Sequence, residues 1–157
     1  MNEDDQAAEG SRQSALAGPS PSASVSDAES QARARAFALQ AAVSLWSDKC
    51  ENIALLDLRG LSPVTDFFVI ATGTSSRQMR ASGEHLKDVA ESASMSLHRH
   101  NLRENDADWV LLDFVDVVVH IFDERARLFY DLEMLWGDAE RITWRNEVDL
   151  PDRPGGA

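Results

Sequence analysis

The chain has 157 residues, 43% of them hydrophobic, which allows one globular domain with flanking segments. Its net charge of −12 disfavours a nucleic-acid-binding function, because phosphates repel an acidic protein that lacks a basic stripe. The single cysteine, Cys50, excludes an internal disulfide, and no apolar run approaches the roughly 20 residues of a membrane span. Together these features predict a cytoplasmic protein.

The first predicted element is a helix that begins at Ser26. Residues 1–25 are rich in Ser, Ala, Pro and Gly and contain too few large apolar side chains to form a core, so we expect a disordered N-terminal extension. Ser26 and Glu29 have the spacing of a capping box at a helix start. Apolar residues then recur at helical spacing as far as Ser47: Phe37, Leu39, Val43, Leu45 and Trp46.

Two strands and a second helix are predicted next. Residues 53–58 are a short apolar run, and residues 67–72 form a longer and more strand-like one. Pro63 places a turn between them, because proline cannot donate to a strand ladder. From Ser76 as far as Leu97 the apolar residues fall on one stripe, which predicts an amphipathic helix.

A hairpin and a third helix complete the predicted domain. Residues 109–113 and 116–122 are typical of neighbouring strands, and both faces of the second are apolar, as expected of a strand covered on both sides. A last helix should run over 124–136, and residues 146–157 are expected to form a flexible tail. The order α-β-β-α-β-β-α predicts a single-domain α/β sandwich with a mixed sheet over residues 26–145.

The turn between the second strand and the second helix has two interpretations. Gly73 leads from the strand into the helix, and such a glycine can bind phosphate through free backbone N–H groups. The further glycine or lysine of known phosphate loops is missing. A nucleotidyltransferase would also need closely spaced carboxylates to hold Mg²⁺, and none follow within reach. We interpret the turn as a corner, with Ser75 and Gln78 as a capping box.

No catalytic, cofactor or metal site is expected. His98 and His100 are two residues apart near a predicted helix end, so they would point to different sides of the helix, which disfavours a zinc site. Cys50 has no neighbouring base in the sequence, and a free thiol of this kind is usually a small buried hydrophobe.

The segment from Glu104 to Glu124 has an unusual composition, with seven carboxylates and no Lys or Arg. Aromatic residues lie within it and just after it: Trp109, Phe114, Phe122, Phe129, Tyr130 and Trp136. Aromatic anchors surrounded by charge of one sign are typical of a protein-binding surface, and a basic protein is the matching partner. An ordinary core under a solvated acidic hairpin would have the same composition, so the residues alone leave both interpretations open.

Three segments resemble the ribosomal silencing factor family, also called RsfS or Iojap: TDFFVIATGTSSRQMRA, WVLLDFVDVVVHIF and RLFYDLEMLW. The resemblance runs from about Ala32 to Trp136, and it implies a nucleotidyltransferase-like fold without catalytic carboxylates. It also implies a factor that binds the large ribosomal subunit through its fourteenth ribosomal protein, blocks joining of the small subunit and represses translation. Some members of the family form homodimers, so a homodimer is a further expectation.

The resemblance places the partner-binding residues on the hairpin and on the last helix. They are Trp109, Leu111, Asp113, Asp116, Phe129, Tyr130, Glu133 and Trp136. We expect the carboxylates Asp113, Asp116 and Glu133 to meet basic side chains at the rim of the interface, with Trp109 as a central anchor.

The hairpin tip departs from the family pattern. Where the family usually has Asp-Tyr-Gly-Asp, this chain has Asp113-Phe114-Val115-Asp116. A β-branched residue is strained at positive φ, so we expect another turn type at this position.

Two functions other than subunit binding are kept as alternatives. They are a nucleotidyltransferase-like enzyme and a self-associating scaffold.

Overall fold

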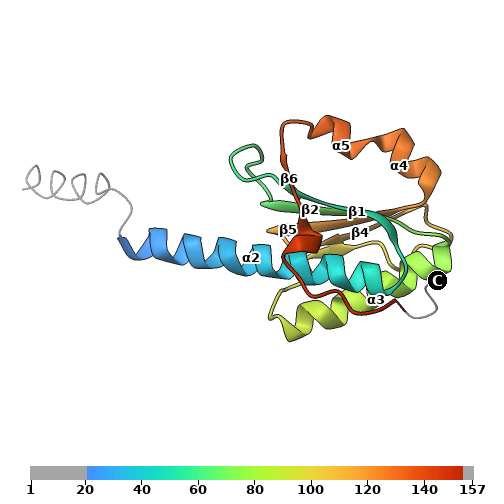
Figure 1. Ribbon diagram of the computed structural model, residues 1–157, viewed down its shortest axis with the longest axis horizontal. Helices are drawn as coiled ribbons and strands as arrows, with labels where there is room; N and C mark the ends of the chain where they lie inside the picture. Colours follow the sequence, from blue (N-terminus) through green and yellow to red (C-terminus); the bar gives the residue numbers. More distant parts are fainter. Residues whose placement is uncertain (1–20, 154–157) are drawn as a thin grey trace, which may run out of the picture. The chain divides into compact units, whose positions relative to one another are not determined.

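The structure is a computed structural model that describes residues 21–153 (Figure 1). The chain divides into two compact units, residues 1–32 and residues 33–157, and the second contains all strands of the described residues. Its strands form one six-stranded sheet in the order β3-β4-β5-β2-β1-β6. The strands are β1 (Glu51–Asp57), β2 (Phe67–Thr72), β3 (Arg99–His100), β4 (Trp109–Asp113), β5 (Val117–Phe122) and β6 (Glu140–Ile142). Because β2 pairs with β5 in parallel and all other pairs are antiparallel, the predicted mixed-sheet α/β fold is confirmed.

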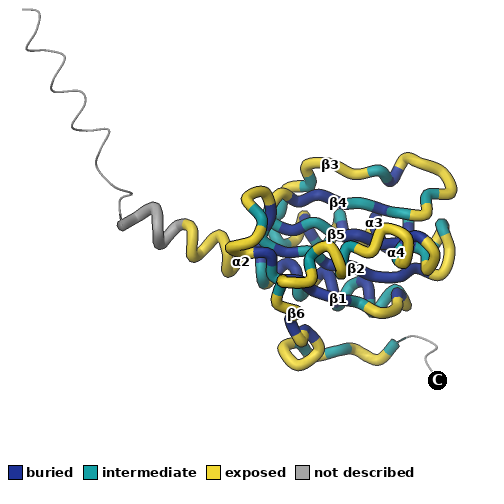
Figure 2. Tube along the Cα trace, turned by 90° about the horizontal axis from the view of Figure 1, so that it is seen from above, coloured by how far each residue is buried: buried dark blue, intermediate teal, exposed yellow. Residues whose placement is uncertain are grey.

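Helices cover both faces of this sheet (Figure 1). The part of α2 (Pro21–Ser47) that belongs to the second unit and α3 (Ser76–Ser92) lie on one face, and α4 (Glu124–Tyr130) and α5 (Leu132–Leu135) lie on the other. The larger core lies under α2 and α3, where Phe37, Leu45, Met79 and Leu86 are fully buried. The sheet residues that they meet are equally buried, as the dark strands of Figure 2 show. This face therefore supplies most of the hydrophobic stabilisation.

The corner at Gly73 is built for close packing. Ser75 caps α3, because its Oγ accepts a hydrogen bond from the backbone N of Gln78 at 3.0 Å. A Cβ at position 73 would overlap the side chain of Met79, which is buried in the core. Glycine is thus required here by the approach of Met79, which is sufficient to explain the residue.

Several boundaries differ from the predicted ones. Helix α2 begins at Pro21, so Ser26 lies inside the helix, while residues 1–20 of the expected disordered extension lie outside the described residues. Helix α3 ends at Ser92 instead of Leu97, and the short edge strand β3 follows only at Arg99. Strands β3 and β6 have two and three residues, too few to produce a recognisable alternation in the sequence.

The predicted last helix is broken at Asp131, which has a left-handed φ of 46°. Asp131 ends α4 and precedes α5, and its backbone N–H donates to the carbonyl of Arg127 at 3.0 Å. Aspartate tolerates the left-handed region better than most residues, so the chain can turn here without glycine. The break changes the directions in which the side chains after residue 131 point.

The C-terminal segment packs against the domain as far as it is described, contrary to the expected flexible tail. Val148 and Leu150 contact the larger core, and Glu147 forms an ion pair with Arg35. The guanidinium of Arg153 lies 4.6 Å from the ring centre of Trp46. These contacts use residues far apart in the sequence, which a reading of local composition does not detect.

At the hairpin tip, the β-branched residue that stands where the family has glycine adopts the positive φ that the expected change of turn type would have avoided. Val115 has a φ of 72°, and the backbone N of Asp116 donates to the carbonyl of Phe114 at 3.0 Å. Asp113 supports the turn, since its Oδ1 accepts from the backbone N of Val115 at 2.8 Å. Buried Phe114, which packs edge-on against Phe37, anchors the tip to the core.

Replacing Val115 with Gly is expected to stabilise the protein by roughly 0.5–1 kcal/mol. A left-handed φ costs an L-residue about 1–2 kcal/mol, and glycine would remove this cost. Because glycine also has more freedom in the unfolded chain, part of the gain in stability is cancelled. Chemical denaturation of the wild type and the variant measures the difference. Val115→Ala, which keeps the Cβ, serves as the matched control and should gain less. Destabilisation by Val115→Gly would mean that contacts of the valine side chain outweigh the backbone strain.

Candidate interaction surface

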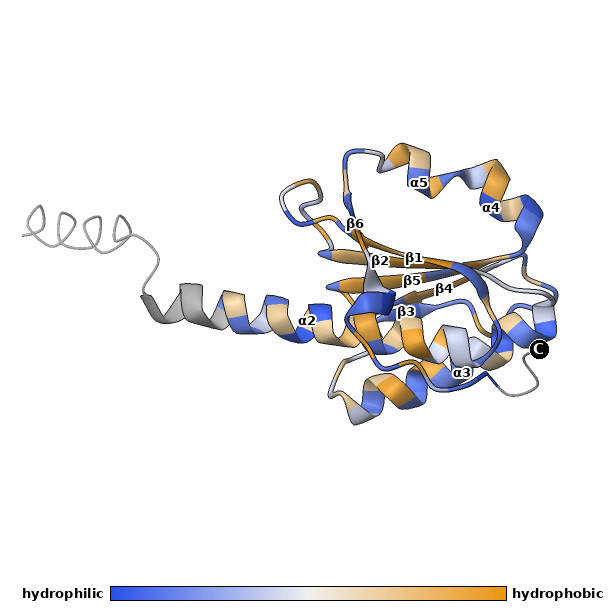
Figure 3. Ribbon diagram, in the orientation of Figure 1, coloured by the Kyte–Doolittle hydropathy of each residue, from blue (hydrophilic) through white to orange (hydrophobic). Residues whose placement is uncertain are grey.

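Five large apolar side chains are exposed together on α4 and α5. Leu128, Phe129, Met134 and Leu135 are between 72 and 81% exposed, and Tyr130 is 45% exposed. We call these five residues the apolar patch. Figure 3 shows orange, hydrophobic segments along both helices. A concentration of exposed large apolar side chains within one short stretch of chain is a mark of an interaction site.

The inner sides of the same helices pack on the sheet. Ala126 is buried, and Leu132 and Trp136 pack against a small core that includes Leu56 and Ile70. Within the patch, Tyr130 also packs against the ring of Trp109, whereas the other four side chains belong to neither hydrophobic core of the described residues. The predicted site residues Phe129 and Tyr130 lie in the patch, whereas Trp136 lies half-buried beneath the helices.

A row of aromatic rings continues from the patch across the sheet. The ring centres are 4.7 Å apart for Tyr130 and Trp109, 5.7 Å for Trp109 and His120, 4.5 Å for His120 and Phe68, and 6.0 Å for Phe68 and Trp136. We call these five residues the aromatic row. It joins the predicted residue Trp109 on β4 to the predicted residues Tyr130 and Trp136 at the ends of the two helices.

Register places the hairpin residues on this face. Trp109 is opposite Phe122 and Leu111 is opposite His120, so Trp109 and Leu111 point to the side of the sheet that α4 and α5 only partly cover. Both remain half-buried. Asn101 supports them from the edge, because its side-chain amide donates to the carbonyl of Trp109 at 2.6 Å and accepts from the backbone N of Leu111 at 2.8 Å. Asn101 thus continues the strand pairing that β3 begins.

Two of the three predicted carboxylates are engaged inside the protein. Asp113 is only 9% exposed, and its carboxylate accepts from Arg99 at 3.0 Å as well as from the turn at Val115. Glu133 accepts from Arg127 at 2.9 Å and from Arg141. Asp116 is half-exposed beside Asp66, a carboxyl whose pKa is raised by burial and by the Asp116 charge. Of the three, Asp116 is therefore the best placed to meet a partner.

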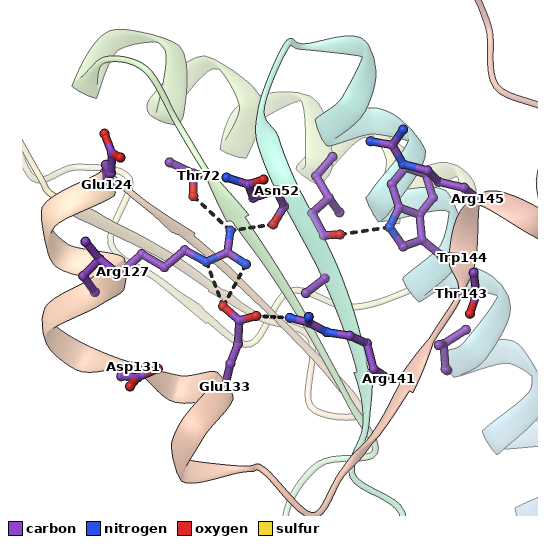
Figure 4. Close-up of a pocket in the computed structure, with 14 residues that line it drawn as sticks. Asn52, Thr72, Glu124, Arg127, Asp131, Glu133, Arg141, Thr143, Trp144 and Arg145 are labelled. Atoms are coloured by element: carbon purple, nitrogen blue, oxygen red, sulfur yellow. Dashed lines mark hydrogen bonds and ion pairs between the residues drawn. The ribbon is translucent and has the colours of Figure 1, made fainter.

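The ion pairs of Glu133 lie in a groove of about 760 Å³ between α4 and the strands β1 and β6 (Figure 4). Arg127 reaches across the groove, where it donates to the carbonyl of Asn52 and to Thr72 Oγ1 at 2.9 Å. Burial lowers the pKa of the Arg127 guanidinium, and the Glu133 carboxylate compensates its charge. The cluster fastens α4 and α5 to the sheet and so fixes the orientation of the apolar patch.

Neither a metal centre nor a membrane segment is found among residues 21–153. Their His, Cys, Asp and Glu side chains form no group of three that could hold a metal ion. The helices of this part of the chain are also too short or too polar to cross a bilayer.

Sequence reasoning missed several residues of the surface. Leu128, Met134 and Leu135 belong to the apolar patch, and Phe68 and His120 belong to the aromatic row. The first three had a detectable signal, since residues 128–136 contain more apolar positions than one side of a helix can bury. The positions of Phe68 and His120 follow only from strand order and register.

Comparisons with known proteins agree with the motifs. A family model described as "Ribosomal silencing factor during starvation", RsfS, matches residues 29–155. The ribosomal silencing factor RsfS of Halalkalibacterium halodurans is 42% identical over 105 residues, which cover 66% of this chain and 89% of that protein. The RsfS of Bacillus subtilis is 40% identical over 102 residues, covering 64% and 86%. The chloroplastic protein Iojap of Arabidopsis thaliana is 37% identical over 68% of this chain and 44% of its own length.

Solved structures resemble the fold as well. A crystal structure of a protein from Chromobacterium violaceum superposes with a TM-score of 0.59 at 32% identity, covering 66% of this chain and 83% of the other. A crystal structure of a protein from Bacillus halodurans superposes with a TM-score of 0.56 at 37% identity, covering 66% and 94%.

Proposed function

The chain belongs to the ribosomal silencing factor family, and on that premise we propose that it binds the large ribosomal subunit and blocks joining of the small subunit. Translation would fall as a consequence. The observation that carries this proposal is the apolar patch, which joins the aromatic row through Tyr130 and whose other four side chains are 72–81% exposed. Such a surface fits a macromolecular partner better than a small substrate.

The partner we propose is a basic ribosomal protein, the fourteenth of the large subunit. Acidic residues surround Trp109 in the sequence, and Asp106, Asp108 and Asp131 are exposed. A basic partner would be attracted by these charges before contact, whereas aromatic and aliphatic side chains would hold it afterwards. Because bare RNA would be repelled, we propose little direct contact with ribosomal RNA.

We propose no catalytic step. The relatives are named as silencing factors, and the surface consists of apolar and aromatic groups, which suit contact rather than bond-making. Self-association through the apolar patch is the alternative occupant of the same surface. Subunit joining takes place where ribosomes work, so a cytoplasmic location is part of the proposal.

Co-sedimentation tests the proposal. The purified protein is mixed separately with bacterial large subunits, small subunits and joined ribosomes, and its mass is measured in parallel by light scattering. We expect it to pellet with large subunits, to remain in solution with small subunits and to reduce the yield of joined ribosomes. Pelleting with small subunits, or failure to pellet with either subunit, would contradict the proposed function. A stable dimer that does not pellet would favour the scaffold.

A further inference from the structure

The indole N–H of Trp109 is already used inside the protein. Trp109 Nε1 donates to His120 Nδ1 at 3.1 Å, a bond between neighbouring strands on the face that carries the aromatic row. The ring itself lies against Phe122 and Tyr130, with ring centres 4.9 and 4.7 Å away. Trp109 is therefore held by one directional contact and two ring contacts, although it remains half-buried.

His120 lies at the centre of the sheet. It is opposite Leu111 on β4 and beside Ile70 on β2, and it is only 4% exposed. Burial lowers the pKa of His120 to about 3, against a smaller opposing effect of the Asp113 carboxylate, so the imidazole is neutral at physiological pH. A neutral ring that accepts at Nδ1 carries its proton on Nε2.

That Nε2–H finds no hydrogen-bond partner among the residues that the structure describes. Burying an unsatisfied donor destabilises the folded state, whereas a Leu or Val at this position would pack on the sheet without that cost. A residue that lowers the stability of the free protein is hard to explain by packing alone. Its one directional contact, the bond from Trp109, is the contact that distinguishes it from an aliphatic residue.

We propose that His120 is a positioning residue, which holds the indole of Trp109 in the orientation that the partner binds. The proposal rests on the proposed function, because it assumes that Trp109 contacts the large subunit. With its donor satisfied internally, Trp109 offers a partner only its ring, which suits an apolar side chain or a stacked cation from a basic protein. A ring fixed before binding also loses less side-chain freedom when the complex forms.

The test compares two replacements of His120 that differ in whether they offer the indole N–H of Trp109 a hydrogen-bond acceptor. His120→Leu removes the acceptor, whereas His120→Asn keeps an acceptor oxygen near the position of Nδ1. Ile70→Val, a change beside His120 that leaves the bond in place, controls for loosened packing. Each variant is checked by thermal unfolding, and if His120→Leu does not fold, His120→Gln, whose acceptor lies further from the indole, replaces it.

Two readouts separate positioning from packing. The first is the ¹H–¹⁵N resonance of the Trp109 indole and its hydrogen-exchange rate, with the peak assigned by its absence in Trp109→Phe. The second is the dissociation rate from purified bacterial large subunits. We expect His120→Leu to lose exchange protection and to bind roughly 2–10-fold more weakly, the range expected for immobilising one side chain. His120→Asn and Ile70→Val should behave like the wild type in both readouts.

Three results would overturn the inference. A wild-type indole that exchanges freely would show that the bond does not hold Trp109. If His120→Leu lost protection but kept the wild-type dissociation rate, the bond would exist without a role in binding, and the proposed function would stand. If folded His120→Asn failed in both readouts, the imidazole would act by its shape. Failure of the wild type to bind large subunits would instead overturn the proposed function, together with the binding role of His120.

Discussion

Replacement of Phe129 by Asp is expected to weaken binding to the large subunit at least about 30-fold, equivalent to about 2 kcal/mol, while the protein stays folded. Phe129 is 81% exposed and contacts Tyr130 edge-on at a ring-centre distance of 5.1 Å. Its side chain thus contributes little to the core but would lie at the centre of an interface formed by the apolar patch. A buried carboxylate would add a desolvation penalty to the lost contact.

A matched variant distinguishes this effect from a general effect of charge. Ala81→Asp adds the same charge at an exposed position of α3, the helix on the opposite face of the sheet, and should bind as the wild type does. Association and dissociation rates with large subunits are measured for both variants after their thermal unfolding has been compared. Wild-type binding by Phe129→Asp would remove the apolar patch from the interface, even if the protein still bound large subunits by another surface.

Acidification should destabilise the protein through His120. Its pKa is about 3 in the folded state and about 6.5 in the unfolded chain, so below pH 6.5 the unfolded state binds a proton that the folded state does not. The stability associated with the neutral ring is therefore complete above pH 6.5 and is lost progressively as the pH falls towards 3. At pH 5 the loss should amount to about 2 kcal/mol of unfolding free energy.

The measurement is denaturant unfolding at several pH values between 7.5 and 5, for the wild type and for His120→Asn. Asparagine does not titrate, so the difference between the two curves isolates His120 from all other groups. Between pH 7.5 and 5, we expect the unfolding free energy of the wild type to decrease by about 2 kcal/mol more than that of the variant. Parallel curves would mean that His120 is not buried as a neutral ring.

These two expectations concern different parts of one surface. Apart from Tyr130, the side chains of the apolar patch are 72–81% exposed and contribute little to folding, so they can be changed with little loss of stability. The aromatic row is partly core, so changes to Trp109 or His120 affect folding and binding together. The ion-pair cluster of Arg127, Glu133 and Arg141 links the two, because it holds the helices of the patch against the sheet that carries the row.

The sequence by itself determined the elements whose pattern is local. The apolar run of residues 67–72, the capping box of Ser75 and the apolar stripe of α3 each lie within one element, and each appears in the structure. The mixed-sheet α/β fold and the family follow from these elements and from three contiguous motifs. Local patterns are readable because side-chain spacing reflects the period of the helix or strand that contains them.

Only the tertiary structure decided where the functional candidates point. Asp113 and Glu133 have the same charge as Asp116, yet ion pairs with Arg99, Arg127 and Arg141 turn them inward. The break at Asp131 reoriented the last helix, and the short strands β3 and β6 extended the sheet. The bond from Trp109 to His120 depends on the register of two strands. Such contacts join residues that are distant in sequence, so no local period records them, and the free energy of packing the whole domain selects them.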